Sequence, residues 1–252
     1  MTLEDFFRKV PKAAVAFSGG TDSAFLLWAA KRYGCDVHAY YMKTSFQPDF
    51  ELEDARKIVD SLNVPMTIVE TDILTVPEAA ANGPNRCYYC KKALFTQLWE
   101  KAREDGYFCL LDGTNASDDA DDRPGMQAIR ELKVRSPLRE CGISKSKVRS
   151  LSEEAGLFTS RKPAYACLAT RIPTGTMITR ELLSKAESAE KALATLGFRD
   201  FRVRLKEDGG ARLQITEEQM PLVFSKRQEI LTILRPLFST ILLDLEARAK
   251  SV

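Results

Sequence analysis

The 252-residue sequence has no long hydrophobic run and almost no net charge. Its longest strongly apolar stretch, Ala24 to Ala30, is far shorter than the roughly 20 residues that a membrane-spanning helix needs. The N-terminal stretch MTLEDFFRKV mixes acidic and basic residues and does not resemble a signal peptide. With 37 Lys and Arg against 35 Asp and Glu, the chain lacks the basic excess of proteins that hold a long polyanion. We therefore expect a globular cytoplasmic protein that binds neither a membrane nor a nucleic acid.

Histidine is almost absent, and only one pair of cysteines is spaced as a motif. The single histidine is His38, and the CxxC of NRCYYCKK (Cys87 and Cys90) has no second CxxC to complete a four-ligand zinc site. The motif does not follow the first strand of a thioredoxin-like unit, which disfavours a redox dithiol. We place it just before a helix expected from about Lys91 to Glu104. Zinc and a disulfide stay open as minor alternatives.

The first part of the chain alternates short apolar runs with amphipathic ones. The runs 13–17, 37–41 and 66–69 are typical of buried strands, and 22–33 and 50–62 are typical of helices. This β-α-β-α-β order predicts an α/β fold with a parallel sheet covered by helices.

The pattern changes after Arg161, where a loop-rich passage begins. A long amphipathic helix is expected from about 179 to 196, and FRVRLKEDGGARLQI reads as two strands joined by a turn at Asp208–Gly210. We therefore predict a first domain at 1–171 and a smaller C-terminal α+β domain at 172–252, with roles in catalysis, substrate binding and oligomerisation.

The string SGGTDS, Ser18 to Ser23, lies between the first predicted strand and helix. Adjacent glycines let the backbone turn tightly, and the amides and dipole of the following helix point at an anion, so a phosphate or pyrophosphate is the expected ligand. A simple βα turn with a polar cap is the alternative. No GK[ST] follows the glycines, so this is not a Walker loop.

SGGTDS resembles the PP-loop of the ATP pyrophosphatase superfamily, whose members cleave ATP between the α and β phosphates and transfer AMP to an oxygen. The resemblance implies an adenine nucleotide alpha hydrolase-like domain that uses ATP and Mg²⁺. It also implies that five residues hold the pyrophosphate portion: Ser18, Gly19, Gly20, Asp22 and Ser23.

Four further motifs narrow the resemblance: GTNASDDADDRPG at 113–125, SPL at 136–138, KP at 162–163 and ACLATR at 166–171. The five acids from Asp112 to Asp122 hold magnesium or simply solvate a loop. Together with SGGTDS, the motifs resemble the ATP-dependent sacrificial sulfur transferases of the LarE family, over about residues 13–215. The resemblance implies adenylation of a carboxylate of pyridinium-3,5-biscarboxylic acid mononucleotide and its conversion to a thiocarboxylate, in nickel-pincer nucleotide cofactor biosynthesis.

The resemblance leaves two sources for the sulfur. In one version a single cysteine, here Cys167, gives up its sulfur and becomes dehydroalanine. In the other, three cysteines hold a [4Fe-4S] cluster whose open iron carries an extra sulfide. Because the sacrificial type needs no CxxC, the presence of Cys87 and Cys90 favours a cluster on these two residues and Cys167.

The anionic nucleotide substrate also needs fixed cations. Arg171, Arg202 and Arg204 are the candidates, and the last two lie two apart on a predicted strand, so that their side chains share a face. A solvated edge strand is the alternative. Glu190 on the long helix resembles an acidic residue near the family's metal and substrate pocket, or is a surface charge.

Two other enzyme classes remain as alternatives. A tRNA-thiolating PP-loop enzyme would show a basic stripe or an added RNA-binding domain, and an ammonia-using adenylating ligase would have no use for the CxxC. The resemblance also implies a homo-oligomer.

Overall fold

The computed structural model describes residues 1–118 and 124–249. The chain forms two compact units, of which the first comprises Met1–Ala79 and Asn85–Lys162 and the second Ala80–Pro84 and Pro163–Val252. Residues 163–171, which we assigned from the sequence to the first domain, are part of the second unit.

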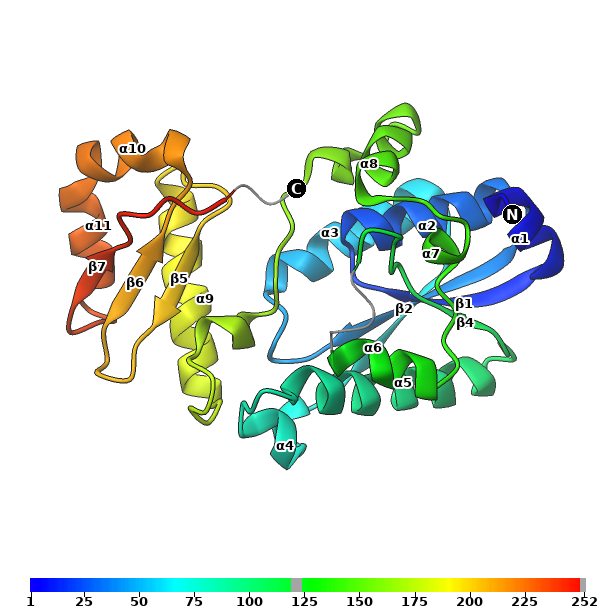
Figure 1. The fold of residues 1–252 in the computed structure, drawn as a ribbon, viewed down its shortest axis with the longest axis horizontal. Helices are drawn as coiled ribbons and strands as arrows, with labels where there is room; N and C mark the ends of the chain where they lie inside the picture. Colours follow the sequence, from blue (N-terminus) through cyan, green and yellow to red (C-terminus); the bar gives the residue numbers. More distant parts are fainter. Residues whose placement is uncertain (119–123, 250–252) are drawn as a thin grey trace. The chain divides into compact units, whose positions relative to one another are not determined.

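Four parallel strands form the sheet of the first unit in the order β3-β2-β1-β4 (Figure 1). Their bounds are Lys12–Phe17 for β1, Asp36–Lys43 for β2, Met66–Glu70 for β3 and Leu110–Leu111 for β4. The central strand β1 is almost wholly buried, since helices cover both faces of the sheet. The predicted parallel α/β sheet is confirmed, and its edge strand β4 has only two residues.

Helices α2, α3 and α8 lie on one face of this sheet and α5 and α6 on the other (Figure 1). The helical segments up to residue 162 are α1 Leu3–Lys9, α2 Thr21–Arg32, α3 Asp49–Leu62, α4 Pro77–Ala80, α5 Arg86–Glu104, α6 Pro124–Glu131, α7 Pro137–Glu140 and α8 Lys145–Glu154, with 3₁₀ turns η1 Ile73–Thr75 and η2 Phe158–Arg161. Odd-numbered residues of β1 and β2, such as Val15 and Val37, pack with α1, α2 and α3 in the hydrophobic core, because successive side chains of a strand point to opposite faces.

The second unit contains a three-stranded sheet in the order β5-β6-β7. Strand β5 (Arg202–Leu205) pairs antiparallel with β6 (Ala211–Gln214), which pairs parallel with β7 (Ile241–Leu243). The turn between β5 and β6 contains Gly209, whose φ of 80° favours glycine. The predicted hairpin is therefore confirmed.

Helix α9 (Arg180–Thr195) packs against β5, and its buried residues include Leu183 and Leu193. The helical segments that complete this unit are η3 Leu168–Arg171, η4 Glu217–Gln219, α10 Met220–Ser225 and α11 Arg227–Leu234. The second unit thus has a helix-on-sheet core of its own.

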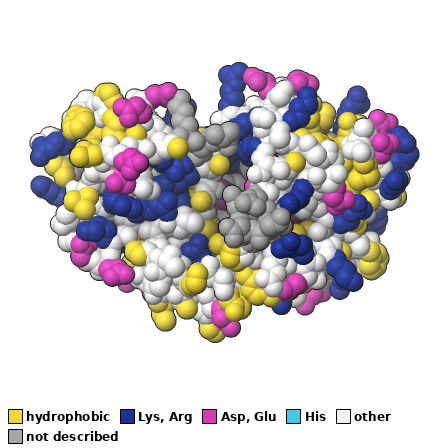
Figure 2. All heavy atoms as spheres, viewed as in Figure 1, with side chains coloured by type: hydrophobic (Ala, Val, Ile, Leu, Met, Phe, Trp, Pro, Cys, Tyr) yellow, Lys and Arg dark blue, Asp and Glu magenta, His cyan; other side chains and the backbone are white. Residues whose placement is uncertain are grey.

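On the face drawn in Figure 2, acidic and basic side chains are interspersed over the first unit, while Lys and Arg side chains gather over the strands of the second. Within the described part of the chain, none of the helices has both the length and the apolar character required to cross a bilayer.

Candidate active site

The loops that follow β1 and β4 meet at the carboxyl end of the sheet. Strand β1 leads through Ser18–Ser23 into α2, and β4 leads into Asp112 and Gly113. These two strands are neighbours, although the chain between them forms β2 and β3 on the other side of β1. Ligands of open parallel sheets bind where the connections change direction in this way. SGGTDS therefore lies where such a fold binds its ligand.

Two glycines allow the close approach of backbone at this point. A Cβ atom on Gly113 would lie 2.8 Å from the backbone nitrogen of Ser23, so Gly113 lets its loop lie directly against the first turn of α2. Gly19 has a φ of 72°, and a Cβ there would lie 3.0 Å from the Glu51 carbonyl oxygen. Larger residues do not fit at either position without moving backbone.

The two serines of the loop form its internal bonds. The Oγ atoms of Ser18 and Ser23 lie 3.1 Å apart, and the Gly20 amide donates to Ser18 Oγ at 3.3 Å. Ser23 Oγ also donates to the Gly20 carbonyl at 3.2 Å. These bonds hold the loop in one conformation ahead of α2, whose N-terminal dipole favours an anion.

Asp22 is the acidic side chain in the first turn of α2. Its Oδ2 accepts a hydrogen bond from Lys145 Nζ at 2.6 Å, whereas its buried Oδ1 has no hydrogen-bond partner among the described residues. Burial raises the pKa of Asp22, and the bond with Lys145 only partly opposes this. A buried carboxylate oxygen left open beside a phosphate loop fits a Mg²⁺ ion, which prefers oxygen ligands.

Lys162, of the KP motif, lies against the same loop. Its Nζ is 3.4 Å from the Gly19 carbonyl oxygen and 2.7 Å from Asp54 Oδ2 on α3. Arg149 of α8 donates to the Lys162 carbonyl at 3.0 Å, which fixes the end of this segment. A motif distant in sequence is thus part of the surroundings of SGGTDS.

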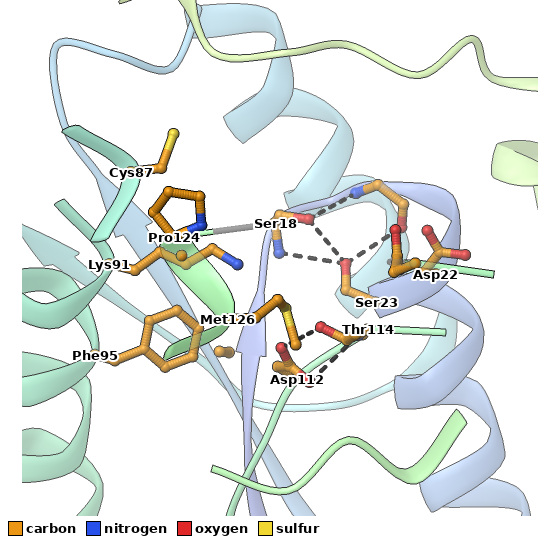
Figure 3. Close-up of a pocket in the computed structure, with 15 residues that line it drawn as sticks. Ser18, Asp22, Ser23, Cys87, Lys91, Phe95, Asp112, Thr114, Pro124 and Met126 are labelled. Atoms are coloured by element: carbon orange, nitrogen blue, oxygen red, sulfur yellow. Dashed lines mark hydrogen bonds between the residues drawn. The ribbon is translucent and has the colours of Figure 1, made fainter. Parts of the chain in front are cut away.

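A pocket of about 540 Å³ opens between the phosphate loop and helices α5 and α6 (Figure 3). From α5 it is lined by Cys87, Lys91 and Phe95. They follow one another at intervals of four residues and therefore share one face of the helix. The other described lining residues are Ala16, Ser18, Gly20, Asp22, Ser23, Asp112, Gly113, Thr114, Asp118, Pro124, Gly125 and Met126.

Asp112 forms the start of the acidic loop and is buried. Its carboxylate accepts from Ser136 Oγ at 2.6 Å, which gives the SPL motif a contact with the site, and from Thr114 Oγ1 at 2.6 Å. The predicted role of the acids up to Asp122 in holding magnesium falls partly outside the described residues, because 119–123 are not among them.

The CxxC does not precede a helix as predicted, because α5 already begins at Arg86 and contains it. The Tyr88 amide donates to the Asn85 carbonyl at 3.0 Å, and the Tyr88 hydroxyl donates to Glu131 of α6 at 2.9 Å. This pairing with α6 extends the helix through residues whose own helix propensity is modest. Cys87 is exposed and Cys90 partly buried.

Cys167 belongs to the second unit and caps the N-terminus of η3. Its carbonyl accepts from the Thr170 amide at 3.0 Å. In residues 1–118 and 124–249, no group of three or more His, Cys, Asp or Glu side chains is placed to hold a metal ion. Cys87 and Cys90 belong to the first unit and Cys167 to the second.

Arg171 and Glu190 form a buried ion pair in the second unit. Arg171 donates from Nε and Nη2 to the two carboxylate oxygens of Glu190, at 2.8 and 2.9 Å. Burial disfavours the charged guanidinium, but the bonds and the charge of Glu190 prevail and raise the pKa of Arg171. The Val203 amide and the Tyr165 hydroxyl also donate to Glu190. Glu190 is thus a buried acceptor at the centre of a hydrogen-bond network and not a surface charge.

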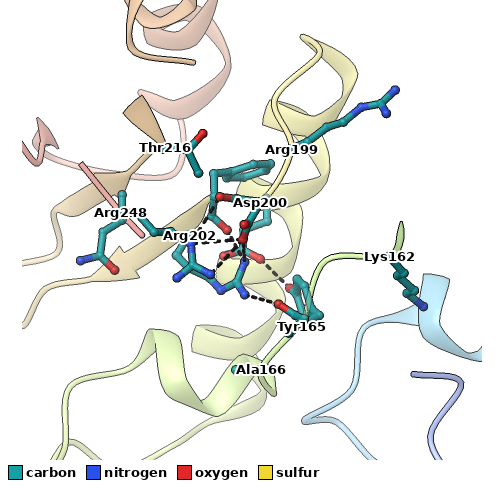
Figure 4. A network of polar contacts seen from close by, with 12 residues as sticks. Lys162, Tyr165, Ala166, Arg199, Asp200, Arg202, Thr216 and Arg248 are labelled. Atoms are coloured by element: carbon teal, nitrogen blue, oxygen red, sulfur yellow. Dashed lines mark hydrogen bonds and ion pairs between the residues drawn. The ribbon is translucent and has the colours of Figure 1, made fainter. Parts of the chain in front are cut away.

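Arg202 and Arg204 flank Val203 on β5. The Arg202 side chain bonds to a residue before η3, and the Arg204 side chain bonds to a residue of η3. Arg202 donates to the Ala164 carbonyl at 2.7 Å, and Arg204 donates to the Thr170 carbonyl. The two side chains therefore share a face. Figure 4 shows Arg202 beside the ring of Tyr165. Burial and the positive charges of Arg171 and Arg248 lower the pKa of Arg202 to about 10.

Lys91, which lines the pocket, and Lys145, which bonds to Asp22, are site residues that the sequence did not predict. The spacing of four between Cys87 and Lys91 would have indicated a shared helix face, had the helix been expected to begin at Arg86. For Lys145 no local signal exists, since its partner Asp22 is distant in sequence.

The parallel sheet, the phosphate loop and the open carboxylate oxygen define a nucleotide-using enzyme of the PP-loop class. The family model described as queuosine biosynthesis protein QueC matches residues 12–82, which include β1, the loop and α2.

Two relatives that cover most of the chain are more than 30% identical to it. An uncharacterized protein of Synechocystis sp., slr1717, is 38% identical over 86% of this chain and 81% of its own length. The pyridinium-3,5-bisthiocarboxylic acid mononucleotide synthase of Lactiplantibacillus plantarum is 34% identical over 90% of this chain and 83% of its own. A tRNA-specific 2-thiouridylase MnmA 2 of Clostridium botulinum is more distant, at 24% identity over 68% of this chain and 58% of its own. The chain belongs to the LarE family of PP-loop enzymes and is an ATP-dependent sulfur-transferring enzyme that uses Mg²⁺.

Proposed function

We propose that this enzyme converts a carboxylate of pyridinium-3,5-biscarboxylic acid mononucleotide to a thiocarboxylate, with release of AMP and pyrophosphate, in the biosynthesis of the nickel-pincer nucleotide cofactor. The proposal is supported by the Lactiplantibacillus plantarum relative, which is named for the bisthiocarboxylic acid mononucleotide. The observation that carries it is the presence of a cysteine, Cys87, in the lining of the phosphate-loop pocket. A sulfur atom beside the place of adenylation has no use in an ammonia-using ligase.

The first step is adenylation. A substrate carboxylate oxygen bonds to the α-phosphorus of ATP while the bond from that phosphorus to the bridging oxygen breaks, and pyrophosphate leaves. Ser18–Ser23 hold the pyrophosphate portion through the loop and the N-terminus of α2. Asp22 and the phosphates would share the Mg²⁺ ion, which supplies positive charge to the leaving pyrophosphate. Lys145 keeps the second oxygen of Asp22 occupied.

The second step is sulfur transfer. A sulfur nucleophile attacks the activated carbonyl carbon, and AMP departs with the oxygen it received from the substrate. With Cys167 as the donor, its sulfur bonds to that carbon. The Cα of Cys167 then loses a proton as the Cβ–S bond breaks, which leaves dehydroalanine in the chain and the thiocarboxylate on the product.

A [4Fe-4S] cluster on Cys87, Cys90 and Cys167 is the other source of sulfur that we propose for this chain. Its support is the CxxC itself, because one turn of α5 presents two thiols and one of them lines the pocket. The third ligand, Cys167, belongs to the second unit, whereas Cys87 and Cys90 belong to the first.

We further propose that the two arginines of β5, Arg202 and Arg204, bind the anionic groups of the substrate. Arg204 is partly exposed and suits direct contact, while the buried Arg202 adds positive charge behind it. The Arg171–Glu190 pair positions this strand, because Glu190 also accepts from the Val203 amide between the two arginines.

The assembly and location of the enzyme complete the proposal. We expect a homo-oligomer that works in the cytoplasm on a small-molecule nucleotide. Light scattering on the purified chain and fractionation of the source cells measure these two properties.

Two variants separate the two steps. Asp22→Asn should lower substrate-dependent AMP formation by roughly 100-fold or more, since it removes a ligand charge at the phosphates. Cys87→Ser should leave AMP formation within about threefold of wild type and stop thiocarboxylate formation if the cluster supplies the sulfur. Asp60→Asn, on the exposed side of α3, is the matched control for Asp22. AMP formation that survives in Asp22→Asn contradicts the assigned role of the loop.

The same samples identify the sulfur source. Iron and acid-labile sulfide in anaerobically purified protein, both lost in Cys87→Ser, support the cluster. A protein without iron that loses the mass of one hydrogen sulfide at Cys167 after turnover supports the sacrificial route. Thiolation of tRNA in place of the nucleotide substrate contradicts the proposed function.

A further inference from the structure

One face of α5 lies across the pocket from the phosphate loop. Cys87, Lys91 and Phe95 line the pocket from this face, and the residues across from them include Ser18 and Ser23 (Figure 3). In the figure the Lys91 side chain extends from α5 into the pocket, toward the loop. A cation therefore faces the site of an anion from a different element of the fold.

Lys91 differs from the other lysines of this region. Lys145 is held by Asp22 at 2.6 Å and Lys162 by Asp54 at 2.7 Å. Of the described residues that line the pocket, Lys91 is the one Lys or Arg, and no hydrogen bond or ion pair joins its ammonium to another described residue. Lys91 is partly buried, and its ammonium is available to pair with an anionic ligand.

The stem of Lys91 lies next to Gly125 of α6. A Cβ atom on Gly125 would lie 2.9 Å from Lys91 Cδ and 3.2 Å from its Cε. Gly125 thus leaves room for the Lys91 side chain, which a Cβ at this position would displace. Because Gly125 has no Cβ atom, the Lys91 side chain has room to reach the pocket.

We propose that Lys91 contacts the α-phosphate of ATP and neutralises its oxygens as the AMP group is transferred. The loop and α2 hold the pyrophosphate end, so the α-phosphate lies beyond them in the pocket, where Lys91 is the one cation among the described lining residues. When the acceptor oxygen bonds to the α-phosphorus and the bond to the bridging oxygen breaks, negative charge spreads over the α-phosphate oxygens. Lys91 stabilises this charge without transferring its proton.

The test compares two ligands that share the pyrophosphate group. The Kd values of Mg²⁺-ATP and of Mg²⁺-pyrophosphate are measured by calorimetry for wild type, Lys91→Met and Lys92→Met. Met keeps the apolar stem of lysine and removes the charge. Lys92 is the next residue of α5, and its ammonium bonds to Tyr88 and Glu131 on the outer side.

We expect Lys91→Met to raise the Kd of Mg²⁺-ATP by roughly tenfold or more, the usual loss for a charge-assisted hydrogen bond. The Kd of Mg²⁺-pyrophosphate should stay within about twofold, and Lys92→Met should change neither. Lys91→Arg, which keeps a charge, should restore part of the ATP affinity. Equal losses for both ligands, or no loss for ATP, would overturn the assignment.

A second readout rests on the proposed function. Substrate-dependent AMP formation should fall by roughly 100-fold in Lys91→Met, more than ATP binding does, because the contact strengthens in the transition state. The binding experiment needs no acceptor. An enzyme with the predicted ATP selectivity that fails to adenylate the pyridinium substrate therefore contradicts the proposed function and leaves the role of Lys91 supported.

Discussion

Asp22 combines two opposing influences in one side chain. Burial raises its pKa, while the Lys145 ammonium at 2.6 Å favours the ionised form. Its open Oδ1 means that the carboxylate is only half satisfied by the described protein groups. Such a residue is suited to accept a cation that arrives with ATP. The cation would then be the partner that Asp22 Oδ1 lacks among the described residues.

His38 is a second residue whose surroundings set its charge. It lies on β2 with its Nε2 2.9 Å from Thr67 Oγ1 and its ring centroid 4.6 Å from that of Tyr40. Burial lowers its pKa below the ordinary 6.5, against the pull of the Asp105 and Asp36 charges, and Lys101 adds to the lowering. Folding therefore favours the neutral imidazole.

This shift predicts how stability depends on pH. Because the pKa is lower in the folded than in the unfolded state, the stabilisation is fully present above 6.5 and is lost as the pH falls through the folded-state pKa. The free energy of unfolding should fall between about pH 7 and about pH 5 more steeply in wild type than in His38→Gln. As the chain has one histidine, an NMR titration of the imidazole reports the pKa directly. A value at or above 6.5 would contradict this explanation.

The junction of two elements decides the shape of the phosphate site. The loop after β4 lies against the first turn of α2 because Gly113 has no side chain. Atoms that a Cβ would meet there are backbone atoms of Ser23 and Asp22, which cannot move without moving the helix.

Gly113→Ala should therefore damage the site more than an ordinary glycine substitution. We expect a loss of about 1–3 kcal/mol of stability, typical of overpacking, and a rise in the Kd of ATP on the order of tenfold. The control is Gly83→Ala, since a Cβ on Gly83 would have nothing within 4 Å. Thermal unfolding and calorimetry measure both effects. Equal behaviour of the two variants would show that the contact at Gly113 is unimportant.

Helix boundaries near the site depended on packing between elements. The sequence indicated a helix from about Lys91, yet α5 begins at Arg86, and α6 occupies Pro124–Glu131, where a loop was expected up to Gly125. Each helix stabilises the other through contacts such as Tyr88 with Glu131. Propensity summed along one segment does not contain this contribution.

At the scale of the whole molecule, the order of elements could be predicted and their pairing in space could not. Alternating apolar runs fix β1, β2 and β3 and their helices, and SGGTDS is a local motif whose geometry follows from its own residues. Lys145 is more than a hundred positions from Asp22, and Asp112 meets Ser136 across another loop, so these contacts depend on the fold. The same is true of the Arg171–Glu190 pair, which only the structure shows to be buried.

The central claim is that this molecule activates a carboxylate as an acyl adenylate before sulfur enters. The most direct measurement uses pyridinium-3,5-biscarboxylic acid mononucleotide labelled with ¹⁸O in its carboxylates, with ATP and Mg²⁺, and mass spectrometry of the products. We predict one ¹⁸O in the AMP for each sulfur gained by the substrate, because the attacking oxygen stays on the α-phosphorus. Label in the pyrophosphate, or unlabelled AMP beside a sulfur-containing product, would contradict the account.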